Sequence, residues 1–567
     1  MKRTKIIATL GPAVETKEKM MALIKAGCDI ARINVAHGDM DYHKTLITTF
    51  REASKAVGKT TAVMLDIKGP EIRTGPVKEG EITLSNGQLL TLTPKEILGT
   101  PNCLHINFPT LARYLEKGDV ILLDDGKIKL RVIEIKEQDI LTRVICGGKI
   151  KGKRGVNIPG KEIPVPYLTS KDQSYLKLAI KEGLDFIAAS FVRTAEDVYV
   201  VKKYLAEAGG EIPIIAKIET QGAIKHIDEI LEISNGIMVA RGDLGVEMPV
   251  EELPGAQKYL LKKACEHARP AIIATQILES MLIQPVPTRA EVSDIANSIL
   301  DGADALMLSG ETAVGKYPVE AVKTLVKVAR RAETLLFKKG EFVELKGGIS
   351  HNMSNAGVLL AREMRADAIL CITRSGKTAR LVSKHRSKAP IIVATYREEI
   401  LRRTCLYWGT QGLVIEKDNS TDAVITQALN KALAYKYIKP ANVLVVITGE
   451  PMGLSGTTNV VQVQIVGDIL GRGTAFGNRR IKGKVWKYDP HKTKEKYEIL
   501  VAKKEPEENA ILNSQAVIIE NKILNPKTVK KAMHKGIIIM VGVKGIYEKI
   551  NQGEVIQLDP QRGLIWR

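Results

Sequence analysis

Residues 214–243, IIAKIETQGAIKHIDEILEISNGIMVARGD, hold two short apolar runs separated by an amphipathic stretch long enough for helix. Short apolar runs bounded by polar residues are typical of buried strands. The same alternation continues on both sides and predicts eight strands, at 6–10, 30–35, 62–67, 186–191, 214–218, 236–240, 271–274 and 305–308. Eight strands alternating with helices predict an α/β fold, a parallel (β/α)8 TIM barrel with its active site at the C-terminal ends of the strands.

The remaining residues predict three further domains. Residues 69–166 interrupt the barrel, which is expected in 1–68 and 167–340, and their strand-like segments and turns predict an inserted β-barrel lid domain. Apolar runs at 368–373, 391–395, 412–415 and 443–448 predict an open α/β domain over 341–468. Residues 469–567, with a helix expected around 527–534, predict an extra small α/β tail domain.

Composition narrows the class of protein. The 567 residues carry 84 Lys and Arg against 64 Asp and Glu, a net charge of +20 that attracts nucleic acid or phosphorylated metabolites. Six cysteines without paired spacing argue against a disulfide framework and a zinc site. Because no apolar run reaches about 18 residues, we expect no membrane span. We expect a cytoplasmic location, because Gly11 and Pro12 break the apolar stretch that follows Met1.

Charged residues cluster where the fifth and sixth predicted strands end. Lys217 and Glu219 share one side of a strand, and Asp243 closes the next strand. A simple salt bridge would explain the first pair. Two carboxylates with few other ligands also suit Mg²⁺, and the cations Arg32, Arg73 and Lys217 on the same rim make phosphate chemistry the natural candidate.

Two further strand ends leave alternatives open. Gly242 is interpreted as a site of close backbone approach at a helix start, or as an ordinary loop glycine. Thr275, Ser309 and Glu311 could form a proton relay, or Ser309 or Thr312 could be the N-cap of a helix with Glu311 in its first turn.

The segment Thr373-Arg374-Ser375-Gly376-Lys377-Thr378 follows a predicted strand and opens a helix. This arrangement favours phosphate binding over an ordinary strand-to-helix turn. Neither a Walker loop nor a kinase catalytic-loop motif occurs in the sequence, so a nucleotide would bind in another way.

Taken together, the motifs resemble those of the pyruvate kinase family across residues 1–468. The motifs that carry the resemblance are ARIN at 31–34, DIKGPEIRTG at 66–75, KIE at 217–219, MVARGDLG at 238–245, ATQ at 274–276 and MLSGET at 307–312.

The resemblance implies transfer of the phosphoryl group of phosphoenolpyruvate to ADP, which gives pyruvate and ATP in glycolysis. It implies Mg²⁺ ligands and phosphate-binding cations at the strand ends already described, with the substrate carboxylate at Gly242, Asp243 and Thr275. Proton delivery would involve Thr275, Ser309 and Glu311. The residues implied for ADP binding are Pro12, His37, Tyr42, Arg73 and Arg154, where Arg154 replaces the usual lysine.

The family's potassium site maps to Asn34, Asp66 and the carbonyl of Ile67, but Ala36 replaces the usual serine ligand. Glu71 is similar to the glutamate of potassium-requiring members, and an acidic residue without a cation nearby would be costly. The hypothesis is that a monovalent cation still binds, weakly or with water replacing the missing hydroxyl.

The resemblance also implies regulation. Residues 373–378 resemble the effector phosphate loop, and 449–459 resemble the loop that covers a phosphorylated effector, most plausibly in a homotetramer. The tail resembles the phosphohistidine swivelling domain of phosphoenolpyruvate-utilising enzymes. It lacks the phosphoacceptor motif, because Asn525-Pro526-Lys527 stands near that place and His534 lies away from it. A structural or oligomer-stabilising role is therefore expected for the tail.

Two other functions compete with this interpretation. A Mg²⁺-dependent barrel lyase acting on pyruvate enolate would share the carboxylate pair, but it would not explain the inserted domain or the effector-like loop. A nucleic-acid-binding protein is suggested by the charge of +20, but 4% aromatic residues and the lack of a nucleic-acid motif oppose it. No nucleic-acid partner is therefore expected.

Overall fold

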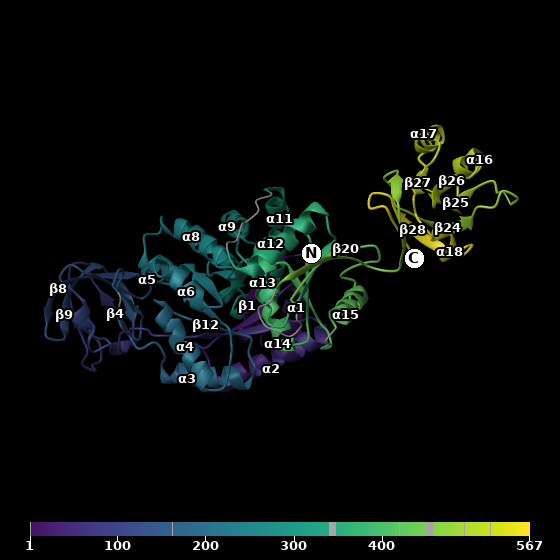
Figure 1. Ribbon diagram of the computed structural model, residues 1–567. Coiled ribbons are helices and arrows are strands. Elements are labelled where there is room, and N and C mark those ends of the chain that lie inside the picture. The colour runs from purple at the N-terminus through teal and green to yellow at the C-terminus, as the bar shows by residue number, and fades with distance from the viewer. Residues whose placement is uncertain are drawn as a thin grey trace. The chain divides into compact units, whose positions relative to one another are not determined.

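The computed structural model describes residues 2–161, 163–339, 347–418, 420–449, 458–492, 494–521 and 523–567 (Figure 1). The chain divides into two compact units. The first comprises Met1–Asn355, Cys371–Val414 and Thr448–Asn459, and the second comprises Ala356–Leu370, Ile415–Ile447 and Val460–Arg567. Residues 450–457 of the expected effector-covering loop and the boundary expected at 340–341 lie outside the described residues.

The first unit contains the expected barrel, closed in the order β1-β16-β15-β14-β13-β12-β3-β2. Its strands are β1 (Lys5–Thr9), β2 (Ile30–Asn34), β3 (Ala62–Ile67), β12 (Phe186–Ala189), β13 (Ile214–Ile218), β14 (Gly236–Ala240), β15 (Ala271–Ala274) and β16 (Ala305–Leu308). The (β/α)8 prediction is confirmed, and five strands have the predicted bounds. β1 is shifted by one residue, while β2 and β12 end one and two residues early.

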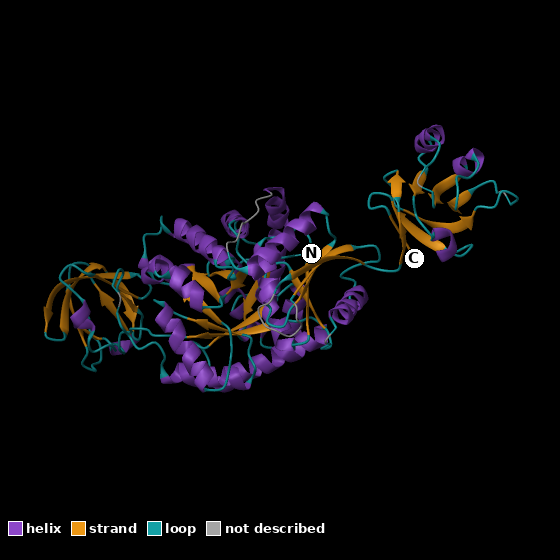
Figure 2. Ribbon diagram, viewed as in Figure 1, coloured by secondary structure: helices purple, strands orange, loops and turns teal. Residues whose placement is uncertain are grey.

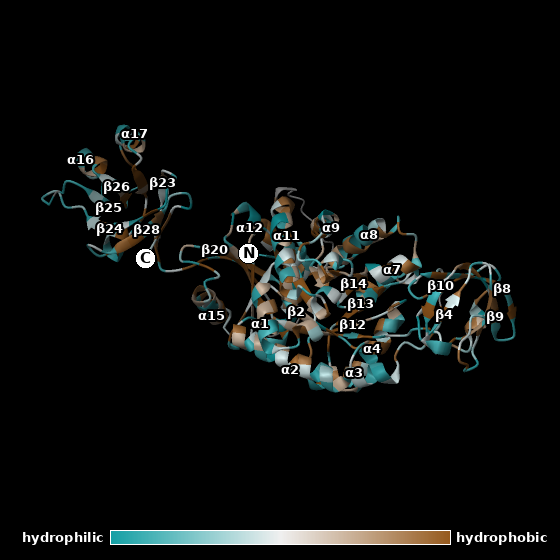
Figure 3. Cartoon of the chain, turned by 180° about the vertical axis from the view of Figure 1, so that it is seen from behind, coloured by the Kyte–Doolittle hydropathy of each residue, from teal (hydrophilic) through white to brown (hydrophobic). Residues whose placement is uncertain are grey.

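The barrel strands are apolar on both faces because each face packs against a different core. Ile6 and Ala8 pack outward in the core beneath the helices, whereas Ile7 packs in the interior cluster with Met64 and Met307. Strands buried on both sides need continuous apolar runs, which is the pattern that predicts them. Figure 3 shows hydrophobic colouring along β12 and mixed colouring along α2 and α3.

Helices follow the barrel strands and cover their outer side (Figure 2). They are α1 (Lys17–Ala26), α2 (Met40–Val57), α3 (Ser170–Lys181), α4 (Ala195–Glu207), α5 (Gln221–Lys225), α6 (Ile227–Ile233), α7 (Arg241–Glu247), α8 (Leu253–Glu266), α9 (Arg289–Leu300), α10 (Gly310–Ala313) and α11 (Pro318–Lys339). In α2, Leu46, Ile47 and Phe50 are buried, and this three-to-four-residue spacing turns one face of the helix to the core. Among the described residues, no helix is both long and apolar enough to cross a membrane.

The inserted segment between β3 and β12 consists of β-strands around its own apolar core. They are β4 (Glu81–Leu84), β5 (Leu89–Thr93), β6 (Cys103–His105), β7 (Val120–Leu123), β8 (Ile128–Lys136), β9 (Asp139–Cys146), β10 (Gly148–Lys151) and β11 (Val156–Asn157). They form a six-stranded sheet, β11-β7-β8-β9-β5-β6, and the pair β10-β4.

The α/β sheet follows the barrel in the chain, and the two units share its strand β17 (Ala368–Ile372). In the first unit the order is β19-β18-β17, and in the second it is β17-β20-β21. The other strands are β18 (Ile391–Thr395), β19 (Thr410–Val414), β20 (Val443–Thr448) and β21 (Val460–Ile465). β21 was not predicted, because its residues VVQVQI are half-buried and lack an apolar run. The helices are α12 (Ile349–Glu363), α13 (Lys377–Lys384), α14 (Glu398–Arg403) and α15 (Thr421–Ala434).

Buried carboxylates precede three barrel strands at the N-terminal end of the barrel. Asp29, Asp185 and Asp304 accept hydrogen bonds from the backbone N–H groups of neighbouring strands, at 2.8–2.9 Å. Cations hold each carboxylate: Lys2 and Lys59 at Asp29, Arg51 and Arg402 at Asp185, and Lys384 and Arg386 at Asp304. Residues after the barrel therefore stabilise its N-terminal end through buried ion pairs.

The second unit ends in the tail, an eight-stranded sheet with the order β22-β29-β28-β24-β25-β26-β27-β23. The strands are β22 (Ile469–Arg472), β23 (Thr474–Phe476), β24 (Ile481–Lys487), β25 (Tyr497–Ala502), β26 (Ser514–Ile519), β27 (Ile538–Val541), β28 (Val555–Asp559) and β29 (Leu564–Trp566). The helices are α16 (Glu508–Leu512), α17 (Pro526–His534) and α18 (Ile546–Lys549). The helix expected around 527–534 is therefore present, one residue longer.

Candidate active site

Lys217 is the centre of a buried polar cluster at the C-terminal ends of β3, β12 and β13. Its Nζ donates to Ser190 Oγ at 2.6 Å and to Asp66 Oδ1 at 3.3 Å, and it lies 2.9 Å from Glu219 Oε1. Burial alone would lower the pKa of Lys217, but the charges of Asp66 and Glu219 outweigh it and hold the pKa above its ordinary value. The ammonium therefore stays charged at neutral pH.

Arg32 lies in the same cluster, at the end of β2. Its Nε donates to Asp66 Oδ2 at 2.7 Å, and its Nη1 donates to Thr9 Oγ1 at 3.1 Å. Burial opposes ionisation of Asp66, but Arg32 and Lys217 lower its pKa. One ionised carboxylate thus orients two cations toward the barrel mouth.

Glu219 and Asp243 are the carboxylates available for a divalent cation. Glu219 Oε2 accepts from Phe191 N at 2.6 Å, while the buried Oε1 has no hydrogen bond within the described ranges despite its closeness to Lys217. Burial raises the pKa of Glu219, and the charge of Asp243 adds to the rise against the opposing effect of Lys217. A buried carboxylate oxygen without a hydrogen bond, beside a second carboxylate, fits the oxygen ligands that Mg²⁺ prefers.

The turn after β15 has an uncommon backbone conformation. Thr275 and Gln276 have φ values of 64° and 53°, in a region that few non-glycine residues adopt. Arg241 holds this turn, because its Nη2 donates to both of their carbonyl oxygens at 2.9 Å and its Nη1 pairs with Asp294 at 2.6 Å. The turn places Thr275 Oγ1 2.9 Å from Gly242 N, which donates to it.

Close backbone packing does not explain why position 242 is glycine. A Cβ atom there would lie 3.5 Å from Thr275 Oγ1, which is an ordinary contact. If the backbone at Gly242 is closely approached, the approaching group must be a ligand, because no protein atom packs tightly there.

Glu311 binds backbone groups at the start of α10. Its carboxylate accepts from Ser309 N at 2.8 Å and from Leu278 N at 3.0 Å. Ser309 is the N-cap residue, but its side chain makes no capping hydrogen bond, and its buried Oγ has no partner among the residues described. Ser309 therefore occupies the N-cap position and Glu311 the first turn, as the capping alternative predicted, but the carboxylate of Glu311 rather than the Ser309 hydroxyl binds the backbone there.

The expected potassium ligands are partly engaged by the protein. Asn34 Oδ1 accepts from Ala36 N at 3.1 Å, and both oxygens of Asp66 face cations. Glu71 has protein cations beside it: its carboxylate lies 2.8 Å from Arg73 Nη2 and 3.2 Å from Lys68 Nζ. The charge of Glu71 is therefore already balanced by two cations of the protein.

The residues expected around a nucleotide form two groups. Pro12, His37 and Tyr42 follow β1 and β2 at the barrel mouth, where Tyr42 Oη donates to Glu15 at 3.4 Å. Arg73 and Arg154 belong to the inserted segment, where Arg73 donates to Lys153 O at 2.8 Å and the backbone N of Arg154 donates to Thr74 Oγ1 at 2.9 Å. Among the described residues, no hydrogen bond or ion pair joins the two groups.

The segment Thr373–Thr378 follows β17 and includes the first two residues of α13, so it opens a helix after a strand, as predicted. Gly376 has a φ of 82° and donates its N–H to Thr373 Oγ1 at 3.0 Å, while Thr378 Oγ1 lies 2.7 Å from Thr458 Oγ1. Arg374 and Ser375 are exposed. The loop therefore exposes polar side chains beside a helix start.

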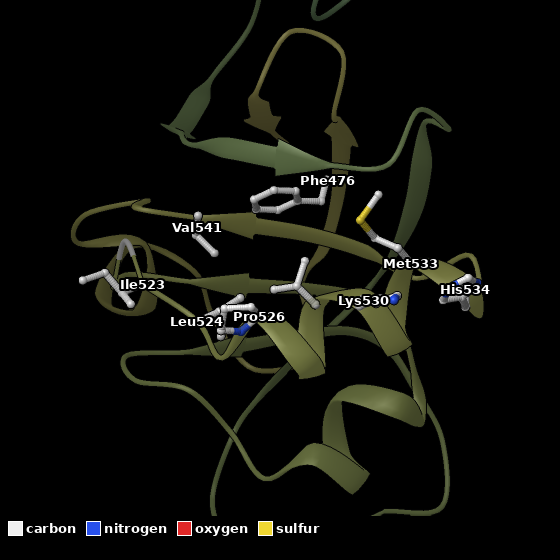
Figure 4. Close-up of a pocket in the computed structure, with 9 residues that line it drawn as sticks. Phe476, Ile523, Leu524, Pro526, Lys530, Met533, His534 and Val541 are labelled. Atoms are coloured by element: carbon white, nitrogen blue, oxygen red, sulfur yellow. The ribbon is translucent and has the colours of Figure 1, made fainter.

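The tail has a largely apolar cavity of about 700 Å³ beside α17 (Figure 4). Figure 4 shows Phe476, Leu524 and Met533 around it, with Lys530 and His534 as its charged or titratable lining residues. Asn525 Oδ1 accepts from Lys527 N at 3.0 Å and thereby caps α17. The residues near the expected phosphoacceptor position thus have a local structural role.

The sequence pattern gives no role to Ser190 or Arg241, although both stand near the ends of predicted strands. Ser190 binds both Lys217 and Asp66, and Arg241 holds the Thr275 turn. Their place at strand ends was the available signal, but their contacts join residues from different strands.

Comparison with known proteins adds independent support. A family model of the pyruvate kinase barrel domain matches residues 1–322, and one of the pyruvate kinase alpha/beta domain matches residues 351–464. Pyruvate kinase of Geobacillus stearothermophilus is 40% identical, over 100% of this chain and 99% of that protein. Pyruvate kinase 2 of Synechocystis sp. is 38% identical, over 100% and 97%. A crystal structure of a pyruvate kinase from Cryptosporidium parvum has a TM-score of 0.76 and 34% identity, covering 82% of this chain and 96% of that one. The chain therefore belongs to the pyruvate kinase family of phosphotransferases.

Proposed function

We propose that this protein transfers the phosphoryl group of phosphoenolpyruvate to ADP, producing pyruvate and ATP. The observation that carries the proposal is the buried cluster in which Lys217 and Arg32 share Asp66 beside Glu219. Phosphoryl transfer depends on positioning and on neutralising charge, and this cluster supplies fixed cations at the mouth of a barrel.

Glu219 and Asp243 would hold Mg²⁺, which when bound supplies positive charge to the enolate and phosphate oxygens. Lys217 would stabilise the phosphoryl group during transfer, while Arg32 and Arg73 bind phosphate oxygens. The fixed contacts of Lys217 and Arg32 with Asp66 support these roles, because cations already oriented need little rearrangement during the reaction.

The substrate carboxylate would bind at Gly242, Asp243 and Thr275. Gly242 N–H donates to Thr275 Oγ1, and the Thr275 hydroxyl donates to Ala274 O at 2.6 Å. A carboxylate could take the hydrogen bond of Gly242 and, after the hydroxyl rotates, that of Thr275. Thr275 would then lie beside the enolate and deliver a proton to it, and Ser309 and Glu311 would support this proton relay. The buried Ser309 Oγ, which lacks a hydrogen bond in the described part of the chain, supports this assignment.

ADP would bind near Pro12, His37 and Tyr42, with Arg73 and Arg154 contributed by the inserted segment. We propose that K⁺ is at most a weak activator through Asn34, Asp66 and the Ile67 carbonyl. Ala36 supplies no side-chain oxygen, and Glu71 is neutralised by Arg73 and Lys68.

We also propose four domains: a barrel (1–68 and 167–340), a lid (69–166), a regulatory domain (341–468) and a tail (469–567). The tail would be a swivelling-domain relative without phosphotransfer, with a structural or oligomer-stabilising role. The protein would be a cytoplasmic homotetramer in which residues 373–378 bind a phosphorylated effector. Light scattering would test the oligomer, and assays with AMP and a panel of sugar phosphates would test the effector.

The deciding experiment measures ATP formed from phosphoenolpyruvate and ADP by the full chain with Mg²⁺. We expect ATP and pyruvate in equal amounts, and a loss of both when Mg²⁺ is chelated. Consumption of a pyruvate-derived substrate without ATP formation would favour the barrel lyase instead. Retention on DNA without ATP formation would favour the nucleic-acid-binding alternative.

A further inference from the structure

A second concentration of positive charge lies in the first unit, away from the Lys217 cluster. It surrounds a cavity of about 760 Å³ near the N-terminal ends of the barrel strands. Lys202 of α4 and Arg269, which precedes β15, contribute two cations from the barrel. This volume is typical of small-molecule sites.

Residues that follow the barrel in the chain contribute the other cations. These are Arg374, Lys377, Arg380, Arg397 and Arg403. Glu211 is the one acidic residue among the described residues that line the cavity. Seven cations and one carboxylate line the cavity, and Glu399 pairs with one of the cations, Arg397. The excess of positive charge remains large, and a cavity lined by one sign of charge concentrates ions of the other sign.

Several of these cations are held in place by backbone groups rather than by carboxylates. Arg269 donates to Leu231 O and to Glu232 O, both at 3.0 Å, and Arg380 donates to Ala268 O. Arg403 donates to the backbone carbonyl of Glu211 at 2.8 Å. Carbonyl oxygens orient a guanidinium without cancelling its charge, so these three cations are fixed but not neutralised.

The cations also repel one another. Burial lowers the pKa of Arg269 to about 10, and the charge of Arg380 adds to this effect. Burial lowers the pKa of Lys202 in the same way, assisted by Arg269. Lys202 forms no ion pair with any carboxylate in the described ranges. Holding these charges together costs stability, and a bound anion would offset that cost.

We propose that this cavity binds a compact organic polyanion, with at least two phosphate or carboxylate groups, between the barrel residues Lys202 and Arg269 and the 374–403 segment. Cations on both walls favour a ligand charged at both ends. The site shares Arg374 and Lys377 with the proposed effector loop and in that part rests on the proposed regulation. It goes further by including the barrel, so that the ligand would touch both the barrel and the segment after it.

The test measures binding of inorganic pyrophosphate to the full chain by calorimetry, at low ionic strength and with EDTA present. Lys202→Gln removes one lining cation that forms no ion pair within the described part of the chain. We expect the Kd of this variant for pyrophosphate to rise roughly tenfold, the usual size for one lost charge-assisted contact. Lys203→Gln is the matched control on the same helix, because Lys203 is exposed and does not line the cavity. It should bind like the unmodified protein.

Two further variants separate this site from the others. Arg374→Gln should weaken binding as Lys202→Gln does; weakening by Arg374→Gln alone would restrict the site to the loop and overturn the barrel contribution. Lys217→Met should leave pyrophosphate binding unchanged. A loss of binding in this variant would show that pyrophosphate binds in the active site instead. Equal affinity of the Lys202→Gln and Lys203→Gln variants would also overturn the proposal. Melting temperatures of all variants confirm that the fold is intact.

Discussion

Replacing Ser190 by alanine tests whether Lys217 must be held in place for catalysis. The Ser190 hydroxyl accepts from Lys217 Nζ at 2.6 Å and donates to Asp66 Oδ1 at 3.1 Å. Without it, Lys217 keeps Asp66 at 3.3 Å and Glu219 at 2.9 Å, so the ammonium stays buried but loses its shortest contact. One hydrogen bond to a charged group contributes about 1.5–3 kcal/mol. If this energy acts in the transition state, Ser190→Ala should lower kcat roughly 10- to 150-fold.

The assay follows pyruvate formation at saturating ADP and Mg²⁺ and varies phosphoenolpyruvate. Because the hydroxyl orients Lys217 rather than the substrate, kcat should fall more than KM rises. The control is Ser174→Ala, since Ser174 lies on α3 and bonds only to Ser170 O in the described structure. A Ser190→Ala enzyme within twofold of the unmodified kcat would refute the reasoning, as would an equal loss in Ser174→Ala.

Four further predictions follow from the same structure. Lys217→Met should lower phosphoryl transfer by at least about a hundredfold without unfolding the chain, because a rim cation is lost and no core cavity opens; near-normal turnover would count against its role. Lys384→Met removes one of the cations that pair with Asp304, at a site where both side chains are at most 2% exposed. It should destabilise the barrel by about 3 kcal/mol, whereas Lys388→Met, at an exposed position, should leave the melting temperature unchanged. Burial opposes ionisation of Asp304, but Arg386 and Lys384 lower its pKa to about 2. The stabilisation by this carboxylate should therefore be complete above about pH 4 and disappear toward pH 2 in acid denaturation, and the Asp304→Asn variant should lose less stability over the same pH range. Turnover measured with K⁺ and with tetramethylammonium should differ only slightly; complete dependence on K⁺ would contradict the proposed weak role.

The sequence by itself determined the barrel. Its strands are buried on both faces, so each leaves a continuous apolar run that can be seen in the sequence alone, and five of the eight have the predicted bounds. The catalytic rim followed from the same pattern, because the C-terminal ends of parallel strands meet at one end of a barrel. β21 was missed because a half-buried strand leaves no such run.

Only the tertiary structure decided which side chains meet. Lys217 contacts Asp66, which is 151 residues away in the chain, and no local period records that pairing. The same reason explains why the ion pair of Glu71 with Arg73 was not predicted, and why Ser190 and Arg241 were given no role from the sequence. The cations at Lys202, Arg269 and Arg374 are likewise scattered in the sequence and become one site only when the chain folds. Hydrophobic burial leaves a repeating local pattern, whereas electrostatic contacts depend on distances in space that the chain sets only once it has folded.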